Sequence, residues 1–234
     1  MEPKEIKTPE EFADICPIDD KDFKQRMATM VEDPGFKYFV EFIMPGINYD
    51  EYKKGLLQLD NKRDFQLKYA CQYLEQVEAG TTSGITSGGT ENLDANNPYT
   101  FVTNHRDIVL DASFINLVLT RNNFPTTEVA IGNNLLAFEW ISTLVKINKS
   151  FIVKRDTTTK GRLAAAIQLS RYIHFAINQK HDSIWIAQRQ GRAKDSNDRT
   201  QDSLIKMLTI GANNPDPVQS LKQLNIAPIS LSYE

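Results

Sequence analysis

The sequence lacks several features that define whole classes of protein. It has only two cysteines and three histidines in 234 residues, and Cys16 and Cys71 fit no redox or metal-binding spacing. No run of about 18 apolar residues is present, so we expect no transmembrane helix. The charged N-terminus, "MEPKEIKTPEEF", has no apolar core of the kind that signal peptides carry. We therefore expect a cytoplasmic protein whose two thiols stay reduced.

Sequence motifs for several kinds of chemistry are also missing. There is neither a P-loop nor a G-x-G-x-x-G phosphate loop. No serine lies in a nucleophile elbow, and neither cysteine neighbours a histidine. The Asp-x-His and Gly-Asp clusters of binuclear phosphoesterases are absent too, and we expect no metal. The remaining residues favour direct transfer to a substrate hydroxyl, without a covalent intermediate on the enzyme.

Charge is distributed unevenly along the chain. Residues 1–100 hold 11 Lys and Arg against 19 Asp and Glu, whereas residues 101–234 hold 16 against 11. This asymmetry has two readings. It indicates either an acidic helical surface beside a mixed domain, or a second half that binds something anionic.

Hydrophobic periodicity divides the chain into three parts. Residues 1–80 carry apolar residues at helical spacing, interrupted at Pro34-Gly35 and Pro45-Gly46, and predict an N-terminal helical region. Residues 81–98 are rich in Gly, Thr, Ser and Asn and predict a linker. Residues 99–234 predict an α/β domain. Because the C-terminal "APISLSYE" breaks off within a predicted strand, we expect the natural protein to be longer.

From residue 99 onward, strands alternate with helices. The predicted strands are 99–103, 128–132, 150–154, 183–188 and 227–232, and the predicted helices are 111–120, 133–147, 160–179 and 201–212. Asp111 is expected to cap the first of these helices. The alternation predicts an α/β fold, with a largely parallel or mixed sheet covered by helices on both faces.

Polar residues follow four of the five predicted strands and include one histidine and six cations. These residues are Asn104, His105, Arg106, Asp107, Asn133, Asn134, Lys154, Arg155, Asp156, Gln188, Arg189, Gln190, Gly191, Arg192 and Lys194. In a parallel sheet the carboxyl ends of the strands meet at one edge, where ligands bind. The sequence therefore predicts a site for an anionic small molecule, most simply a phosphate, beside a titratable base.

His105 is the candidate base. It follows a strand end and precedes a helix, with Asp107 and Asp111 close in sequence, whereas His174 and His181 are expected to be structural. A carboxylate that holds the second ring nitrogen orients a histidine as a general base, which contributes roughly 10²–10⁴ in rate. Asp111 is the expected partner, and Asp107 is the alternative.

Four sequence blocks, taken in order, resemble those of the glycerolipid acyltransferase family, which includes the lysophosphatidic acid and glycerol-3-phosphate acyltransferases. The blocks are "TNHRDIVLD", "SFIVKR", "RQGRAKD" and "IAPISLS", preceded by "GGTENLD". The resemblance covers about residues 85–234, and a bacterial branch with "NHRDIVLD" is the most similar. Two departures stand out. Five residues separate His105 from Asp111 where the family has four, and Gln190 stands where the family usually has Glu.

The resemblance implies an O-acyltransferase that uses acyl-CoA or acyl-carrier protein as co-substrate and no bound cofactor. His105 would activate a hydroxyl of glycerol 3-phosphate or lysophosphatidic acid, and Asp111 would orient His105. The phosphate would be held by Arg155, Arg189, Gly191 and Arg192, with Lys154 and Lys194 as second choices and Asn104, Asp107 and Gln190 in support. It further implies a peripheral membrane contact at the inner face of the cell membrane, for which Phe138 and Trp140 are candidates, and no nucleic acid partner. The alternatives are a metal-dependent phosphoesterase and a degenerate acyltransferase that only binds phospholipid.

Overall fold

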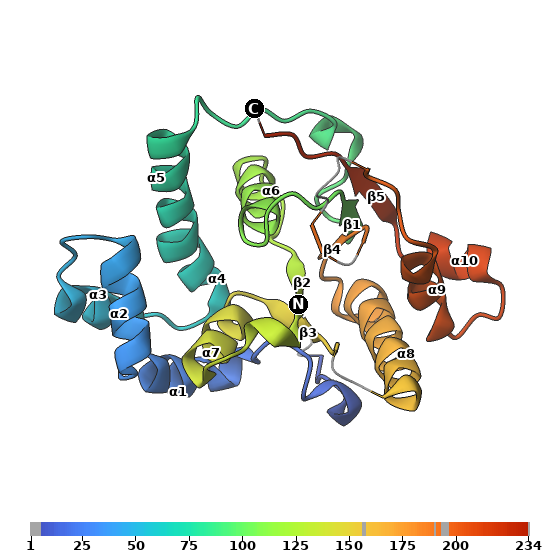
Figure 1. Cartoon of the computed structure of the whole chain (residues 1–234), viewed down its shortest axis with the longest axis horizontal. Coiled ribbons are helices and arrows are strands. Elements are labelled where there is room, and N and C mark those ends of the chain that lie inside the picture. The colour runs from blue at the N-terminus through green and yellow to red at the C-terminus, as the bar shows by residue number, and fades with distance from the viewer. Residues whose placement is uncertain (1–5, 156–157, 190, 193–196, 234) are drawn as a thin grey trace.

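A five-stranded parallel sheet organises the second half of the protein (Figure 1). We describe a computed structural model, which covers residues 6–155, 158–189, 191–192 and 197–233. The strands are β1 (Thr100–Thr103), β2 (Glu128–Gly132), β3 (Ser150–Val153), β4 (Ile184–Ala187) and β5 (Ile226–Ile229). Their order across the sheet is β3-β2-β4-β1-β5, and every pair is parallel. The predicted α/β class is confirmed.

Helices cover both faces of this sheet. The helices are α6 (Leu110–Arg121), α7 (Glu139–Ile147), α8 (Thr159–Phe175), α9 (Asp202–Ile210) and α10 (Pro217–Lys222). The chain crosses the sheet in one direction through α6 and α7 and returns through α8 to α10. Right-handed crossovers therefore place the two groups on opposite faces. Separate apolar clusters agree: Phe101 and Trp185 pack with α6, whereas Phe151 and Ile184 pack with α8 and α9.

The N-terminal helices pack mainly on α7. They are α1 (Asp20–Val31), α2 (Pro34–Ile43), α3 (Tyr49–Leu57), α4 (Lys62–Phe65) and α5 (Cys71–Thr81), and a short π-helical segment, Gln66–Ala70, joins α4 to α5. Figure 1 shows α1–α3 gathered at one side of the molecule beside α7. Their shared core includes Phe23, Phe36 and Leu56, together with Ile147 from α7. A 3-10 turn before α1, Glu10–Phe12, instead adds Phe12 to the cluster under α8.

Three predicted elements need correction. Asp111 does not cap α6, because the helix begins at Leu110; the Asp107 carboxylate accepts the N–H groups of Val109 and Leu110 instead. The helix predicted over 133–147 is divided into a 3-10 turn, Asn133–Leu135, and α7. Helix α10 was not predicted, although Asp216 and Pro217 supply its N-cap and first residue.

Strand β5 lies at the edge of the sheet, which explains the proline within it. Pro228 is opposite Val102 of β1 and has no N–H to donate. Proline is tolerated in a sheet at an edge, where the missing donor faces away from a partner strand. The chain after β5 therefore runs beside the chain after β1, toward His105.

Candidate active site

His105 and Asp111 meet at the carboxyl end of β1. The His105 Nδ1 and Asp111 Oδ2 atoms lie 2.9 Å apart. His105 is 9% exposed and Asp111 is completely buried. The five intervening residues form a turn around Ile108 and Val109, which returns the chain to His105 before α6 begins. Asp111, rather than Asp107, is thus the carboxylate that contacts the histidine.

The Asp111 carboxylate is fixed by four donors. Its Oδ2 accepts His105 Nδ1 and the N–H of Arg106, and its Oδ1 accepts the N–H of Asp107 and the Tyr233 hydroxyl at 2.8 Å. Burial alone would raise the pKa of Asp111, but the hydrogen bonds outweigh it and hold the pKa below its usual value. Asp111 is therefore ionised at neutral pH, and it selects the His105 tautomer that carries its proton on Nδ1.

The other polar residues of this loop have structural contacts. The Asn104 side chain makes two hydrogen bonds with the backbone of Leu231. The Arg106 guanidinium pairs with Asp198, which lies after β4. Trp185 of β4 presents its ring edge-on to His105, with ring centroids 6.2 Å apart, and donates its Nε1–H to Thr103. His105 itself lines a cavity.

A cavity of about 380 Å³ opens beside His105. Its polar lining includes Lys154, Arg155, Arg162, Arg189 and Gly191, and its apolar lining includes Ile108, Ile131, Leu135, Val153, Trp185, Leu204 and Met207. A cavity of this volume accommodates a small ligand or the reactive part of a larger one. Its mixture of guanidinium groups and apolar walls suits an anionic head group joined to hydrocarbon.

The predicted cations are arranged unequally around this cavity. Arg155 and Arg189 line it, whereas Arg192 is exposed and is not part of its lining. Lys154 also lines it, but its ammonium group pairs with Asp14 and donates to Gln168. Gln190 and Lys194 lie outside the described residues.

Sequence reasoning missed two residues that shape the cationic wall. Arg162, in the first turn of α8, lines the cavity; a cation at a helix N-terminus opposes the helix dipole, and this was the available signal. Gly132 ends β2, where an added Cβ would lie 2.6 Å from the Arg155 Nε. The absence of a side chain at Gly132 therefore lets Arg155 cross the end of the strand.

Gly191 has a conformation that favours glycine. Its φ is +74°, in the left-handed region that other residues adopt only with strain. Among the predicted site residues, Gly191 is thus constrained by its backbone as well as by its place in the cavity lining.

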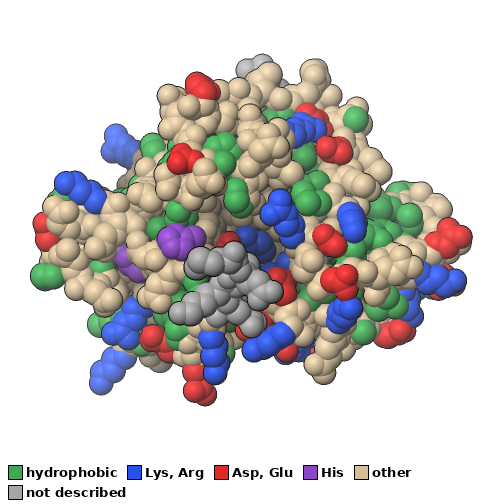
Figure 2. All heavy atoms as spheres, turned by 180° about the vertical axis from the view of Figure 1, so that it is seen from behind, with side chains coloured by type: hydrophobic (Ala, Val, Ile, Leu, Met, Phe, Trp, Pro, Cys, Tyr) green, Lys and Arg blue, Asp and Glu red, His purple; other side chains and the backbone are tan. Residues whose placement is uncertain are grey.

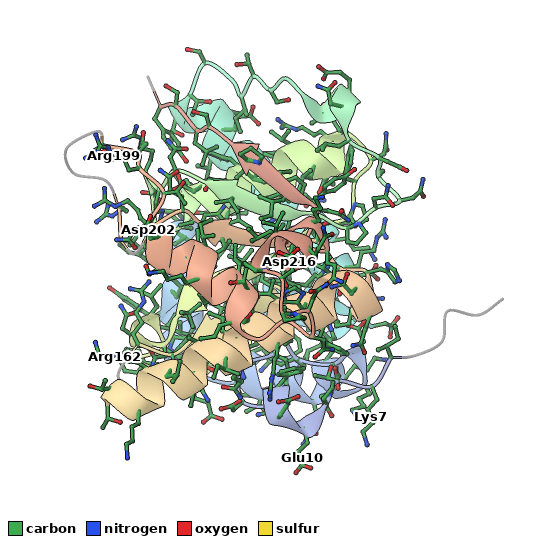
Figure 3. The ribbon with its side chains drawn as sticks, turned by 90° about the vertical axis from the view of Figure 1, so that its right-hand side faces the viewer. Lys7, Glu10, Arg162, Arg199, Asp202 and Asp216 are labelled. Carbon is green, nitrogen blue, oxygen red and sulfur yellow. The ribbon has the colours of Figure 1, made fainter. Side chains whose placement is uncertain are left out.

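Figure 3 shows Arg162 and Arg199 on one side of the molecule and Lys7 on the opposite side.

No metal centre is apparent in the described part of the chain. Within those residues, no three His, Cys, Asp or Glu side chains lie close enough together to hold a metal ion. Asp107, which a metal-dependent mechanism would need as a ligand, is engaged in capping α6. The phosphoesterase alternative is therefore not favoured.

Comparison with protein families identifies the chain. The model of a family described as Acyltransferase matches residues 84–200, which is half of the chain. The protein belongs to the acyltransferase family. The matched region holds β1 to β4, the His105–Asp111 pair and the arginines of the cavity. A search of curated proteins gave no match to this acyltransferase.

None of the helices in the described ranges of this acyltransferase is both long and apolar enough to cross a bilayer.

Proposed function

We propose that this acyltransferase moves a fatty acyl group from acyl-CoA or acyl-carrier protein to a hydroxyl of a glycerol-phosphate acceptor. Glycerol 3-phosphate and lysophosphatidic acid are the acceptors of this type. The observation that carries the proposal is the 2.9 Å His105–Asp111 hydrogen bond beside a cavity lined by Arg155, Arg162 and Arg189. The sequence resemblance to glycerolipid acyltransferases, including their bacterial branch, supports the same acceptor class.

In the proposed mechanism, the His105 Nε2 removes the proton of the acceptor hydroxyl. The hydroxyl oxygen attacks the thioester carbonyl carbon, and a C–O bond forms. The C–S bond then breaks, the acyl group stays on the acceptor, and the thiolate takes the proton from His105. Asp111 stabilises the imidazolium in between and keeps the ring oriented. No bound cofactor is required.

The acceptor phosphate would bind the arginines of the cavity. Arg155 and Arg162 form no ion pair within the described ranges of the chain, which leaves their guanidinium groups to an anionic ligand. Guanidinium groups suit phosphate because they donate parallel hydrogen bonds. Arg189 and Gly191 would complete the phosphate site. Lys154, already paired with Asp14, has a smaller role, as do Arg192 and Lys194.

A degenerate acyltransferase that only binds phospholipid is the second candidate. Gln190 supports it, because a glutamine keeps the shape of the glutamate usual in this block but loses its charge. In that case the lipid would bind the same cavity and no acyl group would be transferred.

We also propose a peripheral contact with the inner face of the cell membrane. Tyr38 and Phe42 of α2 are 71% and 70% exposed, and Phe138 before α7 is 63% exposed. These three rings surround an apolar groove. Trp140, by contrast, packs against Phe36 and Phe39 and belongs largely to the core. Because an acylated product must move into an apolar phase, an exposed aromatic surface suits an interfacial enzyme.

The test is an assay of purified protein with acyl-CoA or acyl-carrier protein, and with glycerol 3-phosphate or lysophosphatidic acid. Free thiol and acylated product are followed with and without a chelator. Acceptor-dependent product that survives the chelator supports the proposed transferase. Loss of turnover with chelator would favour the phosphoesterase. Lipid binding without turnover, with activity gained in Gln190→Glu, would favour the degenerate binder.

A further inference from the structure

The chain segment after β5 is fastened to the loop that carries His105. The Asn104 Nδ2 donates to the Leu231 carbonyl at 2.8 Å, and the Leu231 N–H donates to the Asn104 Oδ1 at 2.7 Å. Strands β1 and β5 pair in parallel as far as Thr103 and Ile229, so these bonds continue the pairing beyond the sheet. Asn104 is 6% exposed, which protects both bonds from competition with water.

Two residues further along, the same segment reaches Asp111. The Tyr233 hydroxyl donates to the Asp111 Oδ1 at 2.8 Å, and its ring lies against Phe114 with centroids 6.5 Å apart. The other three donors to Asp111 come from residues 105–107, within a single loop. Tyr233 is therefore the contact that ties the carboxylate to a distant part of the chain.

We propose that Ser230–Tyr233 is a strap that positions the catalytic pair, with Tyr233 as a positioning residue that acts through Asp111. This inference rests on the proposed role of His105 as a base. The loop of residues 105–107 already holds both oxygens of Asp111, but a carboxylate held only by its own loop moves when that loop moves. Tyr233 anchors the carboxylate to a second part of the chain and so limits that movement. Partners that orient the ligands of a bound metal typically contribute about 10–100-fold to activity, and we expect a contribution of the same order from Tyr233.

Tyr233→Phe tests the strap because it removes only the hydroxyl and retains the ring. We expect kcat to fall roughly ten-fold while KM for donor and acceptor stays unchanged. The acid limb of the kcat profile should move to higher pH, because Asp111 loses a donor that lowers its pKa. The titratable side chains around Asp111 are His105, Tyr233 and Asp107. Tyr99→Phe is the matched control; its hydroxyl accepts the Asp94 N–H at 2.9 Å, before β1 begins, and its loss should leave kcat and the acid limb unchanged.

A second readout separates failure of the strap from failure of the proposed function. In protein labelled with ¹⁵N-histidine, the His105 Nδ1 proton should exchange faster with water in Tyr233→Phe and at the wild-type rate in Tyr99→Phe. If the wild type transfers no acyl group but this exchange changes, the strap stands and the proposed function fails. If the wild type transfers acyl groups and Tyr233→Phe matches it in kcat, acid limb and proton exchange, the strap is overturned, even if that variant is less stable.

Discussion

The two ends of the parallel sheet carry charged residues in different arrangements. At the amino end, the buried Glu128 contacts Lys180, and Asp182 contacts both Lys149 and Lys180. This end faces the viewer in Figure 2, where acidic and basic side chains lie intermingled around a hollow. At the carboxyl end, Arg155 and Arg162 line a cavity beside His105, and within the described chain no carboxylate pairs with them.

This difference suggests that the two ends have different roles. The paired charges at the amino end contribute to stability, whereas the arginines at the carboxyl end belong to the proposed binding site. The amino-end charges neutralise one another; although burial opposes the charge of Lys180, Glu128 and Asp182 raise its pKa above the usual value. An ion network satisfied in this way offers little to a ligand. Arg155 and Arg162 have no such partner within the described residues, and under the proposed function they bind the anionic acceptor. The larger cavity, about 780 Å³ at the amino end, is for this reason a weaker candidate than the smaller one beside His105.

The largest effect is expected at His105. His105→Ala should lower acceptor-dependent thiol release by roughly 10²–10⁴, because the hydroxyl loses its base. His181→Asn is the matched control, since His181 is exposed before β4 at the opposite end of the sheet, and asparagine tolerates its positive φ of 57°. Wild-type rates in His105→Ala would contradict the assignment of the carboxyl end as the active site.

A large effect on stability, but not on catalysis, is expected at the amino end. Lys180→Met leaves the buried Glu128 without its cation and should lower the free energy of unfolding by about 3–5 kcal/mol. Urea denaturation at 25 °C measures the loss. Lys24→Met, which breaks a fully exposed pair with Asp60, should leave it almost unchanged, because water screens exposed ion pairs. A ten-fold fall in kcat for folded Lys180→Met would contradict the claim that the amino-end charges contribute to stability but not to catalysis.

The same network gives a pH dependence with a definite sign. Burial opposes the charge of Asp182, but Lys149 and Lys180 hold its pKa below the usual value. Because the folded pKa lies below that of the unfolded chain, the stabilisation is complete above the unfolded value and is lost as pH falls through the folded one. Asp182→Asn should therefore flatten the acid side of the stability profile measured by denaturation. An unchanged slope in that variant would show that Asp182 carries none of the dependence.

A smaller effect is expected from the cavity arginines. Arg155→Gln should raise the KM for the phosphorylated acceptor by about ten-fold, because a hydrogen bond to a charged group is lost. The KM for the acyl donor should change less. Arg171→Gln is the control, since Arg171 lies on the exposed side of α8 and pairs with Glu11. Equal KM values for the acceptor in both variants would show that Arg155 does not bind the acceptor.

Sequence reasoning could predict the layout because alternating apolar runs determine where strands end. In a parallel sheet those ends meet, which brings Asn104, His105, Arg155 and Arg189 to one edge. Local chemistry was harder to predict. Asp107 and Asp111 are both acidic and near a helix start, and only the turn geometry decides which caps the helix and which contacts His105.

Residues that act through tertiary contacts carried little sequence signal. Tyr233 lies 122 positions from Asp111, and nothing in the sequence around it predicts its hydrogen bond to Asp111. Trp185 reads as an ordinary strand residue, although its ring forms part of the cavity wall beside His105. In the sequence, Gly132 is simply a glycine at the end of a strand. Only the structure shows that the Arg155 side chain lies where a Cβ at this position would be.

The smallest effect is expected on the aromatic surface of Tyr38, Phe42 and Phe138. Phe42→Ser should weaken binding to vesicles by about five-fold, because roughly 1 kcal/mol of apolar burial is lost, and should not change turnover of dissolved substrates. Zwitterionic vesicles are the right probe, since Asp33 and Glu139 border the groove. Val218→Ser, on exposed α10, is the control. Equal vesicle binding by both variants would show that the aromatic surface is not the membrane contact.

The central claim is that the carboxyl end of the sheet transfers an acyl group to a phosphorylated alcohol. The most direct measurement follows thiol release and acylated product together in the wild-type protein, with and without glycerol 3-phosphate or lysophosphatidic acid. We predict one acylated acceptor for each thiol released, and almost no release without acceptor. Thiol release that proceeds equally without acceptor and yields free fatty acid would contradict the claim and identify a hydrolase.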